Sequence, residues 1–430
     1  MSEPQWEHGY PCVKASSMFA ATATRLPAAF NRLAWSNLAA QSAEQIGLAA
    51  APIVAVLALG AGEGETGLLQ MAQTLPFLLL SFPAGVLADR TSRRRLMATA
   101  EGLRVLSLLA ILVLILGGSL TMPLLAILGF IGASGTVAYG VAAPSLVPAL
   151  VARDELAAAN ARLEVARTTA FIAGPAAAGL VVGWLGAGAA FAFAAALSTL
   201  AVLLFLGLEE PPRPKLPPRH FFQDLTEGTR FVVSHTLLRP TVMTAIIYNT
   251  SFFMMQAVFV PYAVRSLGMS ATAIGVAFAF NGIGLVGGAL LAPTIARRIT
   301  FGAFVTLGPV CGFLASVVMA STLWLPSTWL PALSYFLLGI GPMLWIIGTA
   351  TLRQSVTPPG MLGRVSAIVI TATQGSRPMG AALGALIGGT WGAGPCLVIA
   401  AIGFFTQMML VLFSPLPRLL RQPEPMAQTP

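Results

Sequence analysis

The sequence has few charged residues. Of its 430 residues, 9% are Asp, Glu, Lys or Arg and 56% are hydrophobic, whereas a soluble domain carries roughly 25% charged residues. A water-soluble chain this apolar would expose large adhesive patches, so the composition excludes a soluble protein. Crossing a hydrocarbon core takes roughly 20 apolar residues per helix. The 43 glycines and 31 prolines are compatible with such helices, because membrane helices tolerate both residues.

Cysteine and histidine are also scarce. The cysteines Cys12, Cys311 and Cys396 share no metal-ligand spacing, and we interpret them as packing residues without disulfides. All three histidines lie outside the apolar runs. The sequence has no Gly-x-x-x-x-Gly-Lys-Ser/Thr loop, which excludes a fused ATPase. We therefore expect no metal, no cofactor and no enzymatic activity.

Twelve apolar runs predict twelve transmembrane helices. The first six cover 34–60, 66–88, 96–118, 122–146, 164–185 and 187–208, and the last six cover 239–262, 271–295, 302–321, 328–351, 364–389 and 391–414. The expected domains are an N-terminal segment 1–33, a six-helix bundle 34–208, a polar linker 209–238, a second six-helix bundle 239–414 and a tail 415–430. Residues 1–33 do not resemble a cleavable signal peptide, and Met18 is a candidate alternative start.

Lys and Arg are distributed unevenly along these spans. If the N-terminus is cytoplasmic, Arg265 alone falls in an external loop, Arg104 and Arg377 fall within spans, and the remaining 21 of 24 basic residues are cytoplasmic. Cytoplasmic loops of membrane proteins are enriched in these residues. We therefore expect an inner-membrane protein with both termini in the cytoplasm. The same distribution explains the net charge of +9 without nucleic acid as a partner.

A basic motif follows the second span. Residues 85–95 read GVLADRTSRRR and resemble the signature loop of the major facilitator superfamily, with Ser92 in place of the usual glycine. The resemblance implies a conformational latch between two halves of a transporter, formed by Gly85, Asp89, Arg90, Arg93, Arg94 and Arg95. A carboxylate beside four arginines can pair with them and is favoured near a helix N-terminus. The alternative interpretation is an ordinary basic cytoplasmic loop.

Repeated phrases support the same family. Residues 148–160 lead into Gly174-Pro175, and residues 353–365 lead into Pro378 and Gly380, each before the fifth span of its half. The phrases resemble the branch containing macrolide-efflux proteins and the enterobactin exporter. The resemblance implies an all-α membrane protein with twelve transmembrane helices in two pseudo-symmetric six-helix bundles, the major facilitator fold. The motif copy after span eight keeps Gly287, Gly288, Arg297 and Arg298 but no acidic residue, so we expect an asymmetric latch.

Small residues recur at helical spacing in three spans. Span five partly resembles the antiporter signature of drug exporters, which supports export. Residues three or four apart share a helix face, and small ones let helices approach closely. The predicted helix-seam residues are Gly174, Pro175, Gly179, Gly183, Gly284, Gly288, Gly380 and Gly384. Ordinary small-residue helix packing is the alternative.

Charges within spans are functional candidates, because a charge in mid-membrane costs about 2.5–3.5 kcal/mol. Glu44 lies about ten residues into span one, which lines the central cavity in this family. Asn37, Gln41 and Glu44 share one helix face, with Gln45 adjacent. We predict Glu44 as a proton-coupling group and the other three as cavity residues. The alternative is a neutral, hydrogen-bonded Glu44 that only fixes helix packing.

Arg377 lies at mid-depth in span eleven, with Gln374 one turn earlier. Two hypotheses stay open for it: it pairs with Glu44 or a helix carbonyl, or it binds an anionic group of the substrate. Glu101 and Arg104 are expected to form a structural pair near the cytoplasmic surface. The remaining cavity candidates are polar or aromatic, and each is alternatively a packing residue: Tyr139, Tyr248, Asn249, Gln256 and Trp345.

These features predict a secondary transporter that works by alternating access. We expect a proton-coupled exporter of a small amphipathic organic molecule, such as a drug, siderophore or secondary metabolite. The expected partners are the small-molecule substrate, protons and membrane lipid, and the expected state is a monomer. An importer or uniporter of the same fold is one alternative, and a receptor or scaffold without transport is another.

Overall fold

The computed structural model describes residues 26–81, 83–84, 87, 91–152, 155–208, 221–358 and 360–423. These ranges contain helices and no strand, as the all-α prediction required. One helix falls on each predicted span. In the first half these are α2 (Ala28–Leu59), α3 (Glu63–Leu79), α5 (Arg93–Leu116), α6 (Met122–Leu150), α7 (Leu156–Leu185) and α8 (Ala187–Leu206). In the second half they are α10 (Leu238–Arg265), α11 (Ala271–Ala296), α12 (Phe301–Ser321), α13 (Trp329–Val356), α14 (Leu362–Trp391) and α15 (Ala393–Leu412).

Ten of these helices, within the described residues, are each long and apolar enough to cross a membrane. The other two are α3 and α14. The described part of α3 is 17 residues long, shorter than the roughly 20 residues of a typical span. Helix α14 is 30 residues long but contains Arg364, Gln374 and Arg377, polar residues that interrupt its apolar sequence.

The helices alternate in direction, so their connections fall at two ends of the bundle. We call these the Gly60 end and the Arg93 end, after the residues that follow α2 and begin α5. Among the described residues, five glycines have positive φ, and each lies in a connection at the Gly60 end: Gly60, Gly118, Gly186, Gly268 and Gly392. Glycine adopts this conformation without the steric penalty that other residues meet. These glycines allow short connections at this end.

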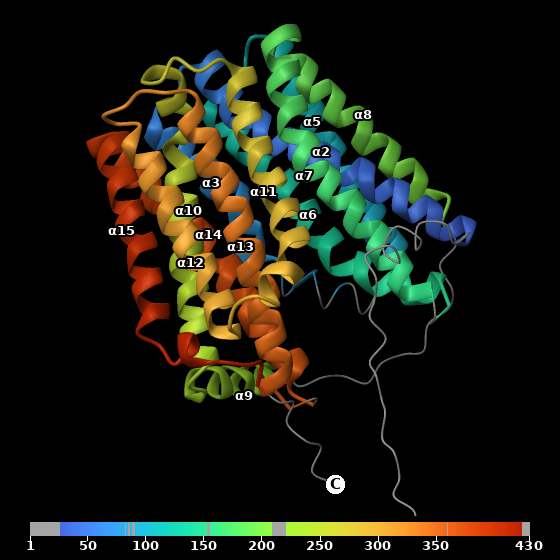
Figure 1. Ribbon diagram of the computed structural model, residues 1–430. Helices are drawn as coiled ribbons and strands as arrows, with labels where there is room; N and C mark the ends of the chain where they lie inside the picture. The colour runs from blue at the N-terminus through green and yellow to red at the C-terminus, as the bar shows by residue number, and fades with distance from the viewer. Residues whose placement is uncertain are drawn as a thin grey trace, which may run out of the picture.

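The helices before and after residues 209–220 form two sets that lie beside one another (Figure 1). Within the first set α2 packs on α7 and α8, and within the second α13 packs on α11 and α12. The main contacts between the sets are those of α3 with α14 and of α7 with α11. Residues 209–220 lie outside the described residues, so the domain boundaries of the linker remain predictions.

Two further segments lie at the Arg93 end. Helix α9 (Phe221–Ser234) packs on α14, where Arg364 Nη1 lies 2.6 Å from Glu227 Oε2. After α15 the chain forms a short 3₁₀ turn (Leu416–Arg418). The backbone N–H of Gly302 then donates to the carbonyl of Leu419 over 2.8 Å. The C-terminal segment is thereby fixed against the start of α12.

Candidate functional site

A cavity of about 580 Å³ lies between the two helix sets. Its walls include residues of α2 and α3 from the first set and of α10, α11, α13 and α14 from the second. Cavities of roughly 300–1,000 Å³ are typical of small-molecule sites. From mid-bundle the cavity reaches Leu238 in the first turn of α10 and Arg353 in the last turn of α13. It therefore extends toward the Arg93 end.

Glu44 faces this cavity and also belongs to a buried ionic network. Its Oε2 lies 3.7 Å from Arg104 Nη2, and its side chain is 13% exposed. Arg104 Nη1 contacts both carboxylate oxygens of Glu101, at 2.7 and 2.9 Å, and Glu101 is fully buried. The predicted Glu101–Arg104 pair is therefore present, but it lies in the interior and reaches Glu44. Two carboxyl groups thus share one guanidinium, which holds Glu101 closely and Glu44 only loosely.

Neighbouring helices complete this network with uncharged groups. Arg104 also donates to the carbonyl of Ala40 over 3.2 Å and to the hydroxyl of Thr136. The Ser198 hydroxyl donates to Glu101. A second pocket of about 60 Å³ touches Glu44, Arg104 and Thr136. It is mainly apolar, but these three side chains give a buried water the polar partners that it needs. Glu44 therefore lies between the large cavity and a small side pocket.

Arg377 is placed differently. Its guanidinium lies over two phenyl rings, with its carbon 5.8 Å from the centroid of Phe77 on α3 and 5.3 Å from that of Phe253 on α10. Distances within about 6 Å allow cation–π attraction. Its buried Nε has no hydrogen-bond partner, and no described residue forms an ion pair with it. The prediction that Arg377 pairs with Glu44 is therefore not met in this conformation, because Glu44 pairs with Arg104.

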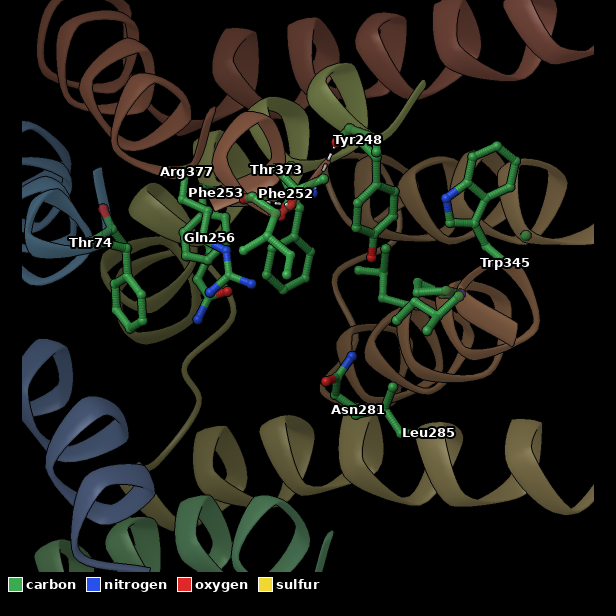
Figure 2. Close-up of a pocket in the computed structure, with 18 of the residues that line it drawn as sticks. Thr74, Tyr248, Phe252, Phe253, Gln256, Asn281, Leu285, Trp345, Thr373 and Arg377 are labelled. Carbon is green, nitrogen blue, oxygen red and sulfur yellow. Dashed lines mark hydrogen bonds between the residues drawn. The ribbon is translucent and has the colours of Figure 1, made fainter. Parts of the chain in front are cut away.

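Aromatic side chains form one wall of the cavity. Tyr248 and Phe252 stack with ring centroids 6.0 Å apart and an interplanar angle of 11°. Figure 2 shows these rings on α10, Trp345 on α13, and Arg377 with Gln256 projecting into the pocket. The Oε1 atom of Gln256 is buried and has no hydrogen-bond partner among the described residues. The cavity thus combines a broad apolar surface with a few unsatisfied polar groups.

The predicted cavity residues divide into two groups. The first group lines the cavity and consists of Glu44, Gln45, Tyr248, Asn249, Gln256, Trp345 and Arg377. Contact of these residues with a substrate remains a prediction. Asn37, Gln41, Tyr139 and Gln374 do not line the cavity. Asn37 and Tyr139 instead satisfy one another inside the first set, since the Tyr139 hydroxyl donates to Asn37 Oδ1 over 2.5 Å. The spacing of Asn37, Gln41 and Glu44 predicted that they share one face of a helix. It did not show that a neighbouring helix covers Asn37.

Glycines account for the close contact between the two helix sets. A Cβ added at Gly179 would lie 2.5 Å from the carbonyl oxygen of Ala271 and 2.7 Å from the Cα of Gly275 on α11. One at Gly183 would lie 2.6 Å from the Thr272 hydroxyl. On the other side of the bundle, a Cβ at Gly67 would lie 2.5 Å from the Cα of Ala385. These contacts are nearer the Gly60 end.

Several predicted seam residues face their own helix set, which corrects the prediction. Gly284 and Gly288 pack on α13, Gly380 and Gly384 pack on α10, and Gly174 packs on Gln45 of α2. The backbone of Pro175, in contrast, faces Gly275 across the seam. Gly284 follows Gly275 by about two and a half helical turns, which places the two on opposite faces of α11. Small-residue spacing identified the packed faces but not the neighbours.

The described part of the predicted latch lies at the start of α5. Gly85, Asp89 and Arg90 lie outside the described residues. Arg93 begins the helix, and Arg94 donates to the carbonyl of Leu206 over 2.6 Å. Ser92 caps α5, because its hydroxyl accepts the backbone N–H of Arg95. The latch itself remains a prediction.

The sequence analysis did not predict some of the residues that form the site. Phe77 and Phe253 come from different helix sets, so their common contact with Arg377 has no pattern in the sequence. Arg353 lines the cavity, and its buried Nε has no hydrogen-bond partner among the described residues. The burial of Glu101 could have been predicted from the sequence, because Glu101 lies eight residues into α5, about 12 Å along the helix axis.

Comparison with known proteins agrees with this architecture. A profile of the family described as transmembrane secretion effector matches residues 29–429. The enterobactin exporter EntS of Citrobacter koseri is 28% identical over 355 residues, covering 79% of this chain and 81% of the relative. The multidrug efflux pump Tap of Mycolicibacterium fortuitum is 26% identical over 332 residues, covering 74% of this chain and 78% of the relative.

Solved structures share the fold. The nucleoside transporter NupG superposes with a TM-score of 0.71 at 13% identity, over 90% of this chain and 98% of that one. A bacterial homologue of the iron transporter ferroportin, in an inward-facing state, gives 0.69 at 16% identity, over 88% and 98%. These likenesses concern the fold alone. The chain is a multi-pass membrane protein, and it belongs to the transmembrane secretion effector family of major facilitator superfamily transporters, not to a family of enzymes.

Proposed function

We propose that this chain exports small amphipathic organic molecules from the cytoplasm in exchange for protons, by alternating access. The observation that carries the proposal is the cavity of about 580 Å³ with Glu44 at its wall. The exporters EntS and Tap support the direction of transport. The partners would be the substrate and protons, with the protein acting as a monomer among membrane lipids.

The charges around Glu44 support a role in proton exchange. Arg104 can neutralise one of its two neighbouring carboxylates, and its short bidentate contact is with Glu101. An unneutralised charge in a membrane interior is expensive. Glu44, which reaches the cavity and is held only at 3.7 Å, is therefore the carboxyl group placed to take up a proton. Protonation would leave the Glu101–Arg104 pair intact.

The positions of the seam and the cavity support an inward-facing conformation. The helix sets touch closely near the Gly60 end, where Arg265 Nη2 also donates to the carbonyls of Gly60 and Ala61 over 2.9 and 2.8 Å. The cavity extends toward the opposite end, where Arg93 begins α5. The distribution of Lys and Arg predicts that this end faces the cytoplasm of a cell with the protein in its inner membrane. The cavity would then receive substrate from the cytoplasm.

A transport assay in inverted membrane vesicles tests this function. A gradient that is acidic inside should drive accumulation of fluorescent drugs or siderophores in vesicles containing the wild type. Glu44→Gln should lose the gradient-driven part, because glutamine cannot exchange a proton. Glu164→Gln, which changes an exposed carboxylate paired with Arg167, serves as the matched control. Accumulation that ignores the gradient, or that persists unchanged in Glu44→Gln, would contradict proton coupling.

A further inference from the structure

The charges of the cavity wall are unequal. Among the described residues that line it, those with charge are Glu44, Arg353 and Arg377. Glu44 already has Arg104 behind it. Neither arginine of the wall forms an ion pair with a described residue, and the Nε atom of each is buried without a hydrogen-bond partner. The part of the cavity wall that the second helix set contributes is therefore positively charged, and no described residue accepts a hydrogen bond from the Nε atom of either arginine.

The rings beside Arg377 leave its donors unsatisfied. A guanidinium has five N–H donors and no acceptor, and Phe77 and Phe253 attract its charge without accepting conventional hydrogen bonds. Leaving a buried donor unpaired costs about 1–3 kcal/mol, and more for a charged group. A carboxylate, sulfonate or phosphate entering the cavity would satisfy these donors in the planar geometry that arginine favours.

Other wall residues define the rest of such a ligand. The stacked rings of Tyr248 and Phe252 and the indole of Trp345 offer flat apolar surfaces within the same cavity (Figure 2). Aromatic surfaces of this kind pair favourably with another ring. Arg353 lies where the cavity approaches the Arg93 end, so an anion would meet a positive charge there before reaching Arg377.

We propose that the cavity selects organic anions that carry an aromatic ring, with Arg377 binding the acidic group and Arg353 attracting it at the entrance. This inference rests on the proposed function, since it assumes that the cavity holds the transported molecule. It excludes an equal preference for organic cations of the same shape. Of the two hypotheses for Arg377, it adopts substrate binding.

Two dyes of similar shape and opposite charge provide the test. Fluorescein is an anion and rhodamine 123 is a cation, and both carry the same fused ring system. Fluorescence polarisation titrations of the purified full-length protein in detergent should give at least about tenfold tighter binding of fluorescein. Arg377→Gln should weaken fluorescein binding by roughly 10- to 100-fold, the range for hydrogen bonds to a charged group. The same substitution should not weaken binding of rhodamine 123.

Three further variants keep the test decisive. Arg298→Gln removes an exposed arginine that does not line the cavity and should leave both affinities unchanged. If Arg377→Gln aggregates, Arg377→Lys and Arg353→Gln replace it, and each should weaken fluorescein binding relative to Arg298→Gln. Equal or tighter binding of rhodamine 123, binding of neither dye, or fluorescein affinity that is insensitive to Arg377 and Arg353 would overturn the proposal.

The vesicle assay separates this inference from the proposed function. Gradient-driven accumulation of rhodamine 123 without fluorescein would leave the exporter in place and refute anion selection. Arg377-dependent binding of fluorescein without accumulation of any dye would support the anion site and refute export.

Discussion

Replacing Gly67 by alanine would test whether the contact between α3 and α14 holds the two helix sets in the present conformation. Gly67 is buried against Ala385, and a Cβ there would lie 2.5, 2.6 and 2.7 Å from its Cα, N and Cβ atoms. Two of these atoms belong to the backbone, so no side-chain rotation can relieve the overlap. The helices must separate near the Gly60 end to accommodate one methyl group.

The cost follows from the size of the overlap. Ordinary contact begins at about 3.4 Å, so the helices must move apart by roughly 0.9 Å. Adding a methyl group to a packed interior costs about 1–3 kcal/mol. A conformation in which this interface is open avoids that cost. The equilibrium between the two should therefore shift toward the open form by roughly 5- to 150-fold.

Distances between spin labels would report the shift. Cysteines at Ser119 and Thr328, in a cysteine-free background, would place one label on an exposed position of each helix set at the Gly60 end. Double electron–electron resonance should show a longer-distance population in Gly67→Ala than in the parent. Gly102→Ala is the matched control, because a Cβ there has no neighbour within 4 Å. Identical distance distributions in the two variants would refute the reasoning.

Three other substitutions have defined outcomes. Arg265→Ala removes an ion pair at 3.5 Å to Glu63 and the hydrogen bonds to the carbonyls of Gly60 and Ala61, and it should increase the same longer-distance population, because these contacts join the two helix sets at the Gly60 end. Glu101→Gln should lower thermal stability in detergent by about 3 kcal/mol, since it leaves a buried arginine poorly compensated, whereas Glu164→Gln should not. Partial burial lowers the pKa of His235, whose Nδ1 accepts the backbone N–H of Leu237 over 3.2 Å. The unfolded chain therefore binds this proton more readily, and stability should fall as pH drops below about 6.5; His235→Gln should reduce the change in melting temperature between about pH 7.5 and about pH 5.5.

The sequence allowed the helices to be placed because a membrane span needs a long apolar run. Every predicted span contains a helix, and many ends agree within a few residues, as for α10 and α11. The ends of α2 and α7 differ more, since both helices continue past their apolar cores into polar residues. Hydropathy records the thickness of the hydrocarbon but not the length of a helix that projects beyond it.

The site was only partly predictable. Glu44 and Arg377 stood out because charge within an apolar run is costly, and both line the cavity. Their partners did not follow from the sequence. Whether Glu44 pairs with Arg104 or Arg377 depends on how α2, α5 and α14 are arranged. Helical spacing predicts which residues share a face of one helix, but it does not predict which helix packs against that face. Tyr139 illustrates the same limit, because its partner Asn37 lies on another helix.

Selection of an anion by the two cavity arginines would also make transport depend on voltage, because the transported molecule then carries charge across the membrane. An anion bound by Arg377 and released outside would carry negative charge out of the cell, and a proton entering through Glu44 would carry positive charge inward. Each charge gains about 2.3 kcal/mol per 100 mV of membrane potential that is negative inside. At 100 mV, one cycle that exports a singly charged anion and imports one proton would gain about 4.6 kcal/mol, enough for roughly 2,000-fold accumulation. A potential set with potassium and valinomycin should therefore drive the anionic dye without any pH difference, and an unchanged rate would contradict this electrogenic cycle.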